Sequence, residues 1–314
     1  MTANEAKHAV LLMAYGTPET PEQVEPYFTH IRGGRTPSPE AVERLRTKYE
    51  KVGGATPLLA ITRDTAAALE RALADAGAPC PVYTGMKHWH PYIAEVLETM
   101  ASDGIESFTA IALAPHYSRM SIGGYRKYIE EGAAKLGRDF DVTFVERWHD
   151  RPEFVEMMAD LVREGLRQFD ASERDDVTVV FSAHSLPERI RTWNDPYESE
   201  LLDSSRRVAD AAGLHDWRFA WQSAGETADP WLGPDILDYL ETLHAEGVRN
   251  VLQVPIGFVS EHLEILWDID YEAKTKAREL GMTLHRTQLP NSSAPLVRAV
   301  AAAILAAESR PAGA

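Results

Sequence analysis

The sequence is poor in cysteine and in basic residues. Cys80 is the single cysteine among 314 residues, so the chain cannot form an internal disulfide or hold an iron–sulfur cluster on four thiolates. A reducing, cytoplasmic compartment fits this composition. Asp and Glu number 48 against 32 Lys and Arg, a net charge of -16, which argues against nucleic acid as a partner.

Long apolar runs and several common motifs are also missing. No apolar run approaches the roughly 20 residues that span a bilayer, and residues 1–8 lack the apolar core of a signal peptide. No G-x-G-x-x-G or Walker A motif indicates a nucleotide cofactor. The segment Ser182-Ala-His-Ser185 places His184 where a G-x-S-x-G hydrolase would need its serine. A soluble protein without these chemistries is expected.

What the sequence does contain is a regular alternation of short apolar stretches and helical patterns. Strands are predicted at 9–14, 81–85, 108–114, 141–145, 177–183 and 251–256, and helices at 20–31, 39–52, 61–76, 91–102, 123–136 and 152–169. Alternation of this kind is typical of an α/β protein with parallel sheets and right-handed crossovers.

A weak internal symmetry divides the chain. Residues 11–19 resemble 180–188, and 111–116 resemble 252–257. We therefore expect two similar Rossmann-like lobes, 1–150 and 151–314, that together form one unit with a cleft between them. Ligands of open α/β sheets bind beyond the carboxyl ends of the strands. The residues expected to line the cleft are Tyr15, His116, His184 and the loop before Glu264.

A row of acidic residues follows the last of these strands. Residues 258–272 have the pattern of a helix, on which Glu264, Asp268 and Glu272 recur at i, i+4 and i+8 on one face. Within 258–272 no lysine or arginine sits at matching offsets. Carboxylate oxygens in a row suit a divalent metal that is held loosely and passed along. A solvated acidic face is the alternative, and the spacing does not decide between them.

His184 lies at the carboxyl end of a predicted buried strand, where an imidazole is well placed for metal ligation or proton transfer. A histidine hydrogen-bonded within a loop is the alternative. Combined with the carboxylates, His184 would suit ferrous iron, cobalt or zinc. Despite its place at a strand end, His116 could either support a ligand residue from behind or lie in the core, and the core is favoured. His88 and His90 could reach one metal, but an exposed substrate rim is favoured for them.

Six motifs together resemble the ferrochelatase family. They are Leu11–Pro18, His30–Arg35, Ala114–Ser118, Ser182–Glu188, Trp221–Asp235 and Phe258–Asp268. The match runs from about Val10 to Arg298. The sequence is most like the coproporphyrin III ferrochelatases of Gram-positive-type bacteria. Some relatives carry an iron–sulfur cluster on four cysteines, which this sequence, with Cys80 alone, cannot hold.

The resemblance implies insertion of Fe²⁺ into coproporphyrin III, giving coproheme in heme biosynthesis. It implies that His184 and Glu264 are catalytic and flank the metal, and that Asp268 and Glu272 lead the ion in from the surface. Porphyrin contacts are implied at Tyr15, which can ligate iron from the other face, and at Arg32, Lys48, Tyr49, Thr56 and Tyr125. Gly33 stands where some relatives have arginine, so a propionate contact there is not carried over.

The resemblance further implies no tightly bound cofactor, since Fe²⁺ is a substrate, and a downstream enzyme that processes coproheme. A monomer is expected. The chemistry agrees with these residues, because metallation must remove two pyrrole protons while iron sheds water, and a bent ring exposes its nitrogens. A His/Glu pair can serve as base, as metal donor or as both.

Two alternatives stay open at this point. One is a protoporphyrin ferrochelatase, or a cobalt or nickel chelatase of tetrapyrroles, on the same scaffold. The other is a heme carrier that uses Tyr15 and His184 as ligands without catalysis. A carrier has no use for a row of carboxylates, so the acidic helix favours an enzyme.

Overall fold

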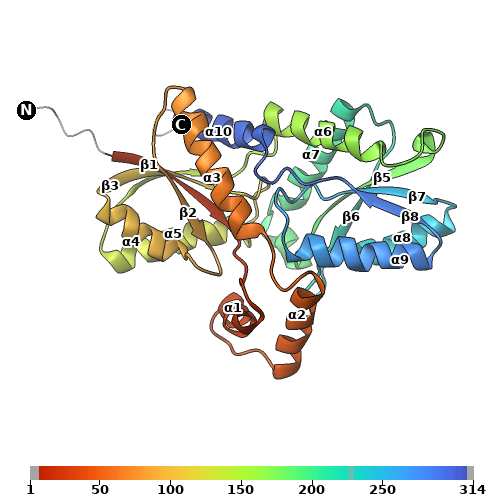
Figure 1. Ribbon diagram of the computed structural model, residues 1–314, viewed down its shortest axis with the longest axis horizontal. Coiled ribbons are helices and arrows are strands. Elements are labelled where there is room, and N and C mark those ends of the chain that lie inside the picture. The colour runs from red at the N-terminus through yellow and green to blue at the C-terminus, as the bar shows by residue number, and fades with distance from the viewer. Residues whose placement is uncertain (1–6, 226, 228, 310–314) are drawn as a thin grey trace, which may run out of the picture. The chain divides into compact units, whose positions relative to one another are not determined.

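The computed structural model describes residues 7–225, 227 and 229–309, so six of the eight residues inspected for a signal peptide lie outside it. The chain divides into two compact units. The first comprises the chain up to Glu153 together with the stretch from Asn291 onwards, and the second is Phe154–Pro290. Each contains a four-stranded parallel sheet with helices on both faces (Figure 1). The predicted α/β class with two lobes is confirmed.

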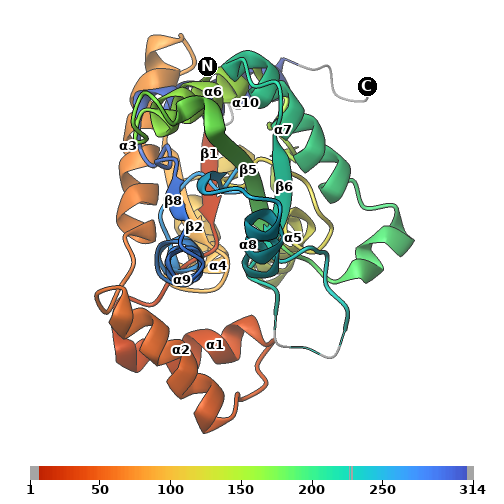
Figure 2. The same cartoon turned by 90° about the vertical axis from the view of Figure 1, so that its right-hand side faces the viewer.

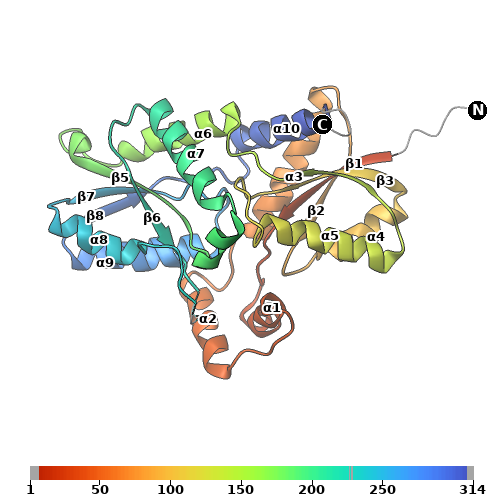
Figure 3. The same ribbon diagram turned by 180° about the vertical axis from the view of Figure 1, so that it is seen from behind.

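The sheet of the first unit has the order β2-β1-β3-β4. Its strands are β1 Lys7–Ala14, β2 Val82–Met86, β3 Ile105–Ala112 and β4 Asp141–Val145. Helices α3 Leu58–Asp75 and α10 Ala294–Glu308 cover one face of the sheet, and α4 Ile93–Ser102 and α5 Ile122–Leu136 cover the other (Figure 3). Strand β4 has the bounds that the sequence predicts; the other predicted elements shift by a few residues at their ends.

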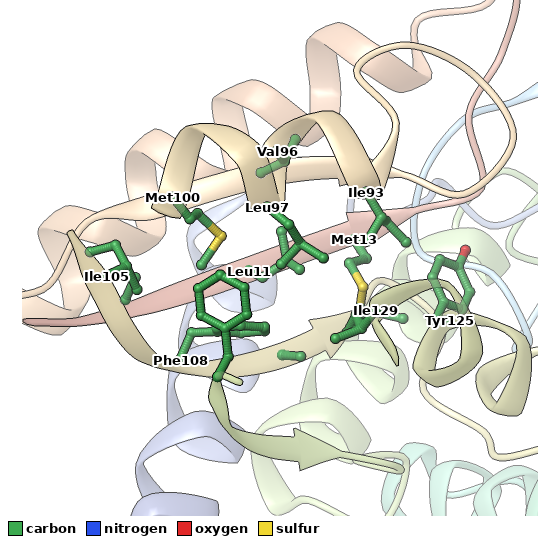
Figure 4. Packing of buried hydrophobic residues seen from close by; sticks show 14 of the residues in the cluster. Leu11, Met13, Ile93, Val96, Leu97, Met100, Ile105, Phe108, Tyr125 and Ile129 are labelled. Atoms are coloured by element: carbon green, nitrogen blue, oxygen red, sulfur yellow. The ribbon is translucent and has the colours of Figure 1, made fainter. Parts of the chain in front are cut away.

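The core of this unit follows from side-chain alternation along buried strands. Leu11 and Met13 of β1 and Phe108 of β3 point to the same face of the sheet, where they pack against Leu97 of α4 and Ile129 of α5 (Figure 4). Leu11, Met13 and Phe108 are fully buried. Burial of each such side chain stabilises the fold by roughly 2 kcal/mol.

Two helices stand apart from this sheet, α1 Val24–Ile31 and α2 Pro39–Lys51. Ser38 caps α2, because its Oγ accepts a hydrogen bond from the backbone N–H of Ala41 at 3.2 Å. Buried hydroxyls tie the end of α2 to the loop after β1, where Thr17 Oγ1 lies 3.3 Å from the hydroxyl of Tyr49.

The second unit repeats the plan with the order β6-β5-β7-β8. Its strands are β5 Val177–His184, β6 Arg218–Gln222, β7 Asn250–Val254 and β8 Thr283–Arg286. Helices α6 Pro152–Leu166 and α7 Tyr197–Ala212 lie over one face, and α8 Ile236–Ala245 and α9 Lys274–Glu279 over the other (Figure 2). Short 3₁₀ segments occur in this unit at Arg174–Asp176 and Glu188–Trp193, and in the first unit at Pro21–Gln23.

The predicted acidic helix differs from the ordinary α-helix we expected. Ile265–Ala273 forms a π-helix that continues directly into α9. A π-helix closes i→i+5 hydrogen bonds, whereas an α-helix closes i→i+4 bonds with 3.6 residues per turn. Residues four apart therefore fall slightly short of a full turn, and they still share a face. Ile265, Ile269 and Ala273 form such a row, and all three are fully buried.

The C-terminal stretch from Asn291 departs from the predicted division at residue 150. Helix α10 packs against α3, β3 and β4 of the first unit, so this stretch belongs there and not to the second lobe. Its apolar face must cover a sheet, and the periodicity does not state which one. Within the described residues, no helix combines the length and the apolar character needed to cross a membrane.

Candidate active site

His184 and Glu264 meet at the carboxyl end of the second sheet. His184 is the last residue of β5, and Glu264 immediately precedes the π-helix. His184 Nε2 lies 3.4 Å from Glu264 Oε1. On the other side of the carboxylate, His262 Nε2 lies 3.4 Å from Glu264 Oε2. Sequence analysis paired His184 with Glu264 and missed His262, which stands only two residues before Glu264.

The surroundings of His184 favour its protonated form. Burial alone would lower the pKa of His184, but the Glu264 carboxylate outweighs burial and raises that pKa to about 9. His184 Nδ1 faces the backbone carbonyl oxygen of Ser185, so Nδ1 carries a proton and Nε2 is directed at Glu264. Without a metal, the His184 imidazole is a cation that donates from Nδ1 to the Ser185 carbonyl oxygen and from Nε2 to Glu264 Oε1.

Glu264 responds in the opposite direction. Burial would raise the pKa of Glu264, but His184 and His262 hold it well below its ordinary value. The pKa of His262 is itself raised by Glu264 against the effect of burial. The side chains of His184 and Glu264 are 30% and 34% exposed, so a ligand can reach both. An incoming cation would replace the protons that now neutralise the carboxylate.

The carboxylates of Asp268 and Glu272 follow along the same helix. Glu264, Asp268 and Glu272 are all partly exposed, beside the buried row Ile265, Ile269 and Ala273. Trp267 and Tyr271, also four residues apart, stack with ring centroids 4.5 Å from each other. Residues four apart thus lie side by side in this π-helix, as the predicted row requires.

The acids nevertheless form a row rather than a closed cage. Among the described residues, no group of three or more His, Cys, Asp or Glu side chains converges as a metal-binding set. Asp268 accepts a hydrogen bond from the hydroxyl of Ser223. An open row of acceptors suits transient contact with a cation better than permanent retention.

The first unit carries the predicted porphyrin contacts. Tyr15 directly follows β1 and is 40% exposed, with its ring 4.5 Å from that of His88. Lys87 is buried, and its Nζ lies 6.0 Å from the ring centroid of Tyr15 and 5.0 Å from that of Tyr125. Burial lowers the pKa of Lys87 to about 8. Gly124 makes room for this amine, since a Cβ there would lie 2.5 Å from Nζ.

The other predicted contact residues differ in exposure. Arg32 is exposed beside the ring of Phe28, and Lys48 is partly buried. Tyr49, Thr56 and Tyr125 are buried, and burial raises the pKa of Tyr125. Thr56 Oγ1 lies 2.8 Å from Thr17 Oγ1.

Two of the remaining histidines are where they were expected. His116 is buried and stacks on the ring of His149, as a core histidine should. His90 is exposed and pairs with Glu95 at 2.8 Å. The prediction for His88 was wrong, because His88 is buried with its Nδ1 3.1 Å from His30 Nδ1. His88 lies two residues after the end of β2, where its backbone N–H donates to the carbonyl oxygen of Tyr15 at 2.8 Å and holds this segment against the loop after β1.

Comparison with known proteins gives one consistent answer. The family model described as Ferrochelatase matches residues 7–308. A protein of Herpetosiphon aurantiacus named Ferrochelatase is 50% identical over 294 residues, 93% of this chain and 96% of that protein. A Coproporphyrin III ferrochelatase of Bacillus subtilis is 40% identical over 302 residues, 95% of this chain and 97% of that protein.

A solved structure supports the fold independently. SirB from Bacillus subtilis with Fe³⁺ superposes with a TM-score of 0.60 at 12% sequence identity, covering 96% of each chain. At that identity the likeness concerns the fold alone. The two-lobed arrangement of parallel sheets is therefore shared by proteins of quite different sequence.

Proposed function

The chain belongs to the ferrochelatase family of metal-inserting enzymes of heme biosynthesis, and on that premise we propose that it inserts Fe²⁺ into coproporphyrin III to form coproheme. The observation that carries the proposal is the His184–Glu264 pair, 3.4 Å apart and partly exposed at a strand end, with Asp268 and Glu272 behind it on one helix. The coproporphyrin III specificity is supported by the name of the relative from Bacillus subtilis. A monomer, and a downstream enzyme that consumes coproheme, belong to the same proposal.

The reaction exchanges protons for a metal. Coproporphyrin III loses two pyrrole protons, Fe²⁺ loses its water, and four Fe–N bonds form. In this proposal Glu264 accepts protons and His184, once neutral, offers Nε2 to the iron. The two groups are already coupled, because the proton on His184 Nε2 is directed at Glu264. Arrival of the cation and departure of that proton are therefore linked events.

Asp268 and Glu272 have the role of conducting Fe²⁺ to Glu264. Hard carboxylate oxygens replace the water around the ion a few at a time, and the open row leaves each site with few protein ligands. A cation held weakly at each step can move on. The favourable field of the acidic row also concentrates cations at its outer end.

The first unit has the role of holding the porphyrin. Coproporphyrin III carries four propionates, which the exposed Arg32 and the partly buried Lys48 can pair with. Tyr15 has the role of an axial contact to the iron. The buried Tyr49, Thr56 and Tyr125 act through the shape of the wall they build.

The proposal is tested by an anaerobic absorbance assay with Fe²⁺ and each of two porphyrins. We expect metallation of coproporphyrin III with a kcat/KM at least about tenfold above that for protoporphyrin IX, a difference of about 1.4 kcal/mol in transition-state binding. The reverse preference would assign the chain to the protoporphyrin branch of the family.

The same assay tests the assigned pair. Glu264→Gln and His184→Ala should abolish turnover while coproporphyrin III still quenches protein fluorescence with unchanged affinity. Arg191→Ala, which removes a surface guanidinium paired with Glu198 in the same unit, is the control and should retain activity. Iron insertion by either site variant at a near wild-type rate would exclude that residue from catalysis.

A further inference from the structure

Three buried polar side chains lie on adjacent strands of the second sheet. Ser182 of β5, Gln222 of β6 and Gln253 of β7 are each fully buried. In the strand register Gln222 pairs with His184, and Gln253 pairs with Val180. Alternate residues of a strand share a face, so all three side chains are on the face of the sheet that carries His184. Buried polar groups require partners, and these side chains bond to one another, although Gln253 Oε1 has no hydrogen-bond partner among the described residues.

These side chains form a hydrogen-bond chain with one direction. Gln253 Nε2 donates to Ser182 Oγ at 2.9 Å, and Ser182 Oγ donates to Gln222 Oε1 at 2.9 Å. Gln253 Nε2 also lies 3.4 Å from Gln222 Oε1. Because its oxygen is occupied in this way, Gln222 turns Nε2 towards Ser223 Oγ, 3.5 Å away.

The last member of the chain reaches the acidic row. Ser223 directly follows β6, and its hydroxyl donates to Asp268 Oδ2. The backbone of Ser223 has φ 61°, in the left-handed region that serine rarely adopts. Strain of this kind persists where the surroundings impose it, and it is concentrated at functional sites. Here it brings the hydroxyl against the carboxylate.

We infer that Gln253, Ser182 and Gln222 are positioning residues for metal delivery: through Ser223 they fix the orientation in which Asp268 meets the incoming ion. Gln222 donates to Ser223 Oγ, so the hydroxyl proton of Ser223 stays directed at the Asp268 carboxylate, which accepts it. Successive hydrogen bonds of one direction also strengthen one another. The inference depends on the proposed function only in that the ion passes Asp268.

The test separates metal use from porphyrin use. Gln222→Met interrupts the chain without touching Asp268. Ser182→Ala removes its middle member and leaves Gln222 Oε1 only the longer, 3.4 Å contact with Gln253 Nε2, and Ser182→Thr retains the hydroxyl. Ser205→Ala is the matched control, since Ser205 is an equally buried serine of the same unit whose Oγ donates to the backbone oxygen of Leu201 at 2.8 Å. For each variant we would measure the KM for Fe²⁺, the KM for porphyrin, kcat and the thermal midpoint. Calorimetric titration of the porphyrin-free protein with Co²⁺ gives a readout independent of turnover.

The expected result is a selective change. Gln222→Met and Ser182→Ala should raise the KM for Fe²⁺ and weaken Co²⁺ binding about fivefold, the effect of one lost uncharged hydrogen bond. The KM for porphyrin should change by less than about twofold. Ser182→Thr should restore metal use, and Ser205→Ala should leave it unchanged.

Two results would overturn the inference. One is unchanged Fe²⁺ KM and Co²⁺ affinity in both interrupting variants. The other is a parallel rise of both KM values together with a fall in kcat and in the thermal midpoint, which would show that the hydrogen-bond chain is purely structural. The porphyrin in the assay is whichever one the wild type metallates, so a failure of the coproporphyrin proposal is seen separately.

Discussion

Lys87 shows how a single residue opposes stability inside the first unit. Its amine is buried among the rings of Tyr15 and Tyr125, and donates to the backbone oxygen of Ser121 at 3.2 Å. No carboxylate contributes to the pKa of about 8; burial is the cause. A buried charge with this environment lowers stability unless it serves a ligand.

Lys87→Met should therefore stabilise the protein at neutral pH. The folded pKa of about 8 lies below the usual 10.5, so the penalty on the folded state is fully present below pH 8. It disappears as the pH rises through the unfolded value. We expect the free energy of unfolding at pH 7 to rise by roughly 3 kcal/mol, with most of this gain lost at pH 10, as measured by urea denaturation at both pH values.

Lys127 provides the control for this substitution. It lies on α5 with a side chain 69% exposed, and Lys127→Met should change the free energy of unfolding by less than about 0.5 kcal/mol. A gain from Lys87→Met of equal size at pH 7 and pH 10 would show that apolar packing, rather than relief of a buried charge, is responsible.

The π-helix is held in place by a buried arginine that pairs with carboxylates outside the row Glu264, Asp268 and Glu272. Arg286, at the end of β8, is only 10% exposed and pairs with Asp270 at 2.7 Å and with Glu261 at 3.1 Å. Asp270 belongs to the π-helix, and Glu261 to the loop before it. One guanidinium thus ties the helix and its leading loop to the sheet, with Glu264 between the two attachment points.

Arg286→Met should remove this attachment and leave two carboxylates without their shared partner. We expect the free energy of unfolding to fall by about 3 kcal/mol, the usual effect of breaking a buried ion pair, in a chemical denaturation experiment. Arg206→Met offers a matched comparison. Arg206 pairs with Asp203 and Asp210 at the surface, is 55% exposed, and should lose less than about 1 kcal/mol. Similar losses in both variants would contradict the anchoring role.

At the level of elements, the sequence predicts type and order well up to residue 169, and local geometry less well. Beyond that point only β5, β7 and the acidic helix were predicted, whereas β6, β8, α7, α8 and α10 were not. The bounds of β4 were predicted to the residue, although it is an edge strand of which only Val145 is buried. The π-helix was missed, since residues four apart share a face in both kinds of helix. His262 was missed for a related reason. On an α-helix it would point away from Glu264, and only the loop conformation before Ile265 brings the two together.

Helix α10 links the ends of the chain at the level of the whole molecule. It buries Leu296, Val300 and Ile304 completely while covering the sheet of the first unit. Near its end, Glu308 Oε1 accepts a hydrogen bond from Thr109 at 2.7 Å and lies 3.0 Å from His8 Nε2. The first and last described segments therefore fold as one piece.

Ile304→Ala should destabilise the first unit by about 3 kcal/mol, the sum of lost apolar burial and the cavity left behind. The measurement is the midpoint and slope of chemical denaturation. Arg298→Ala, at an exposed position of the same helix, should cost less than about 0.5 kcal/mol. If the two substitutions had equal effects, α10 would not be part of the core of this unit.

The division of the whole chain could be predicted only in part. Repeated motifs indicated two lobes and placed the first boundary near Asp150, close to Glu153. Nothing in the periodicity of residues 294–308 identifies the sheet that the helix covers, because any apolar face would accept it. The cleft predicted between the lobes stays a prediction, and so does the meeting of porphyrin contacts from the first unit with His184 and Glu264.

Because α10 packs on the first sheet, the first unit can complete its fold only after the second unit has been synthesised. When a ribosome has released the first 153 residues, one face of the nascent sheet has α3 but still lacks α10, whereas the 154–290 segment contains its whole core in one uninterrupted stretch. At translation rates of about 5–20 residues per second, the part of that face over β3 and β4 waits on the order of ten seconds for its cover. Newly made N-terminal halves should therefore depend on chaperones until the carboxyl terminus emerges.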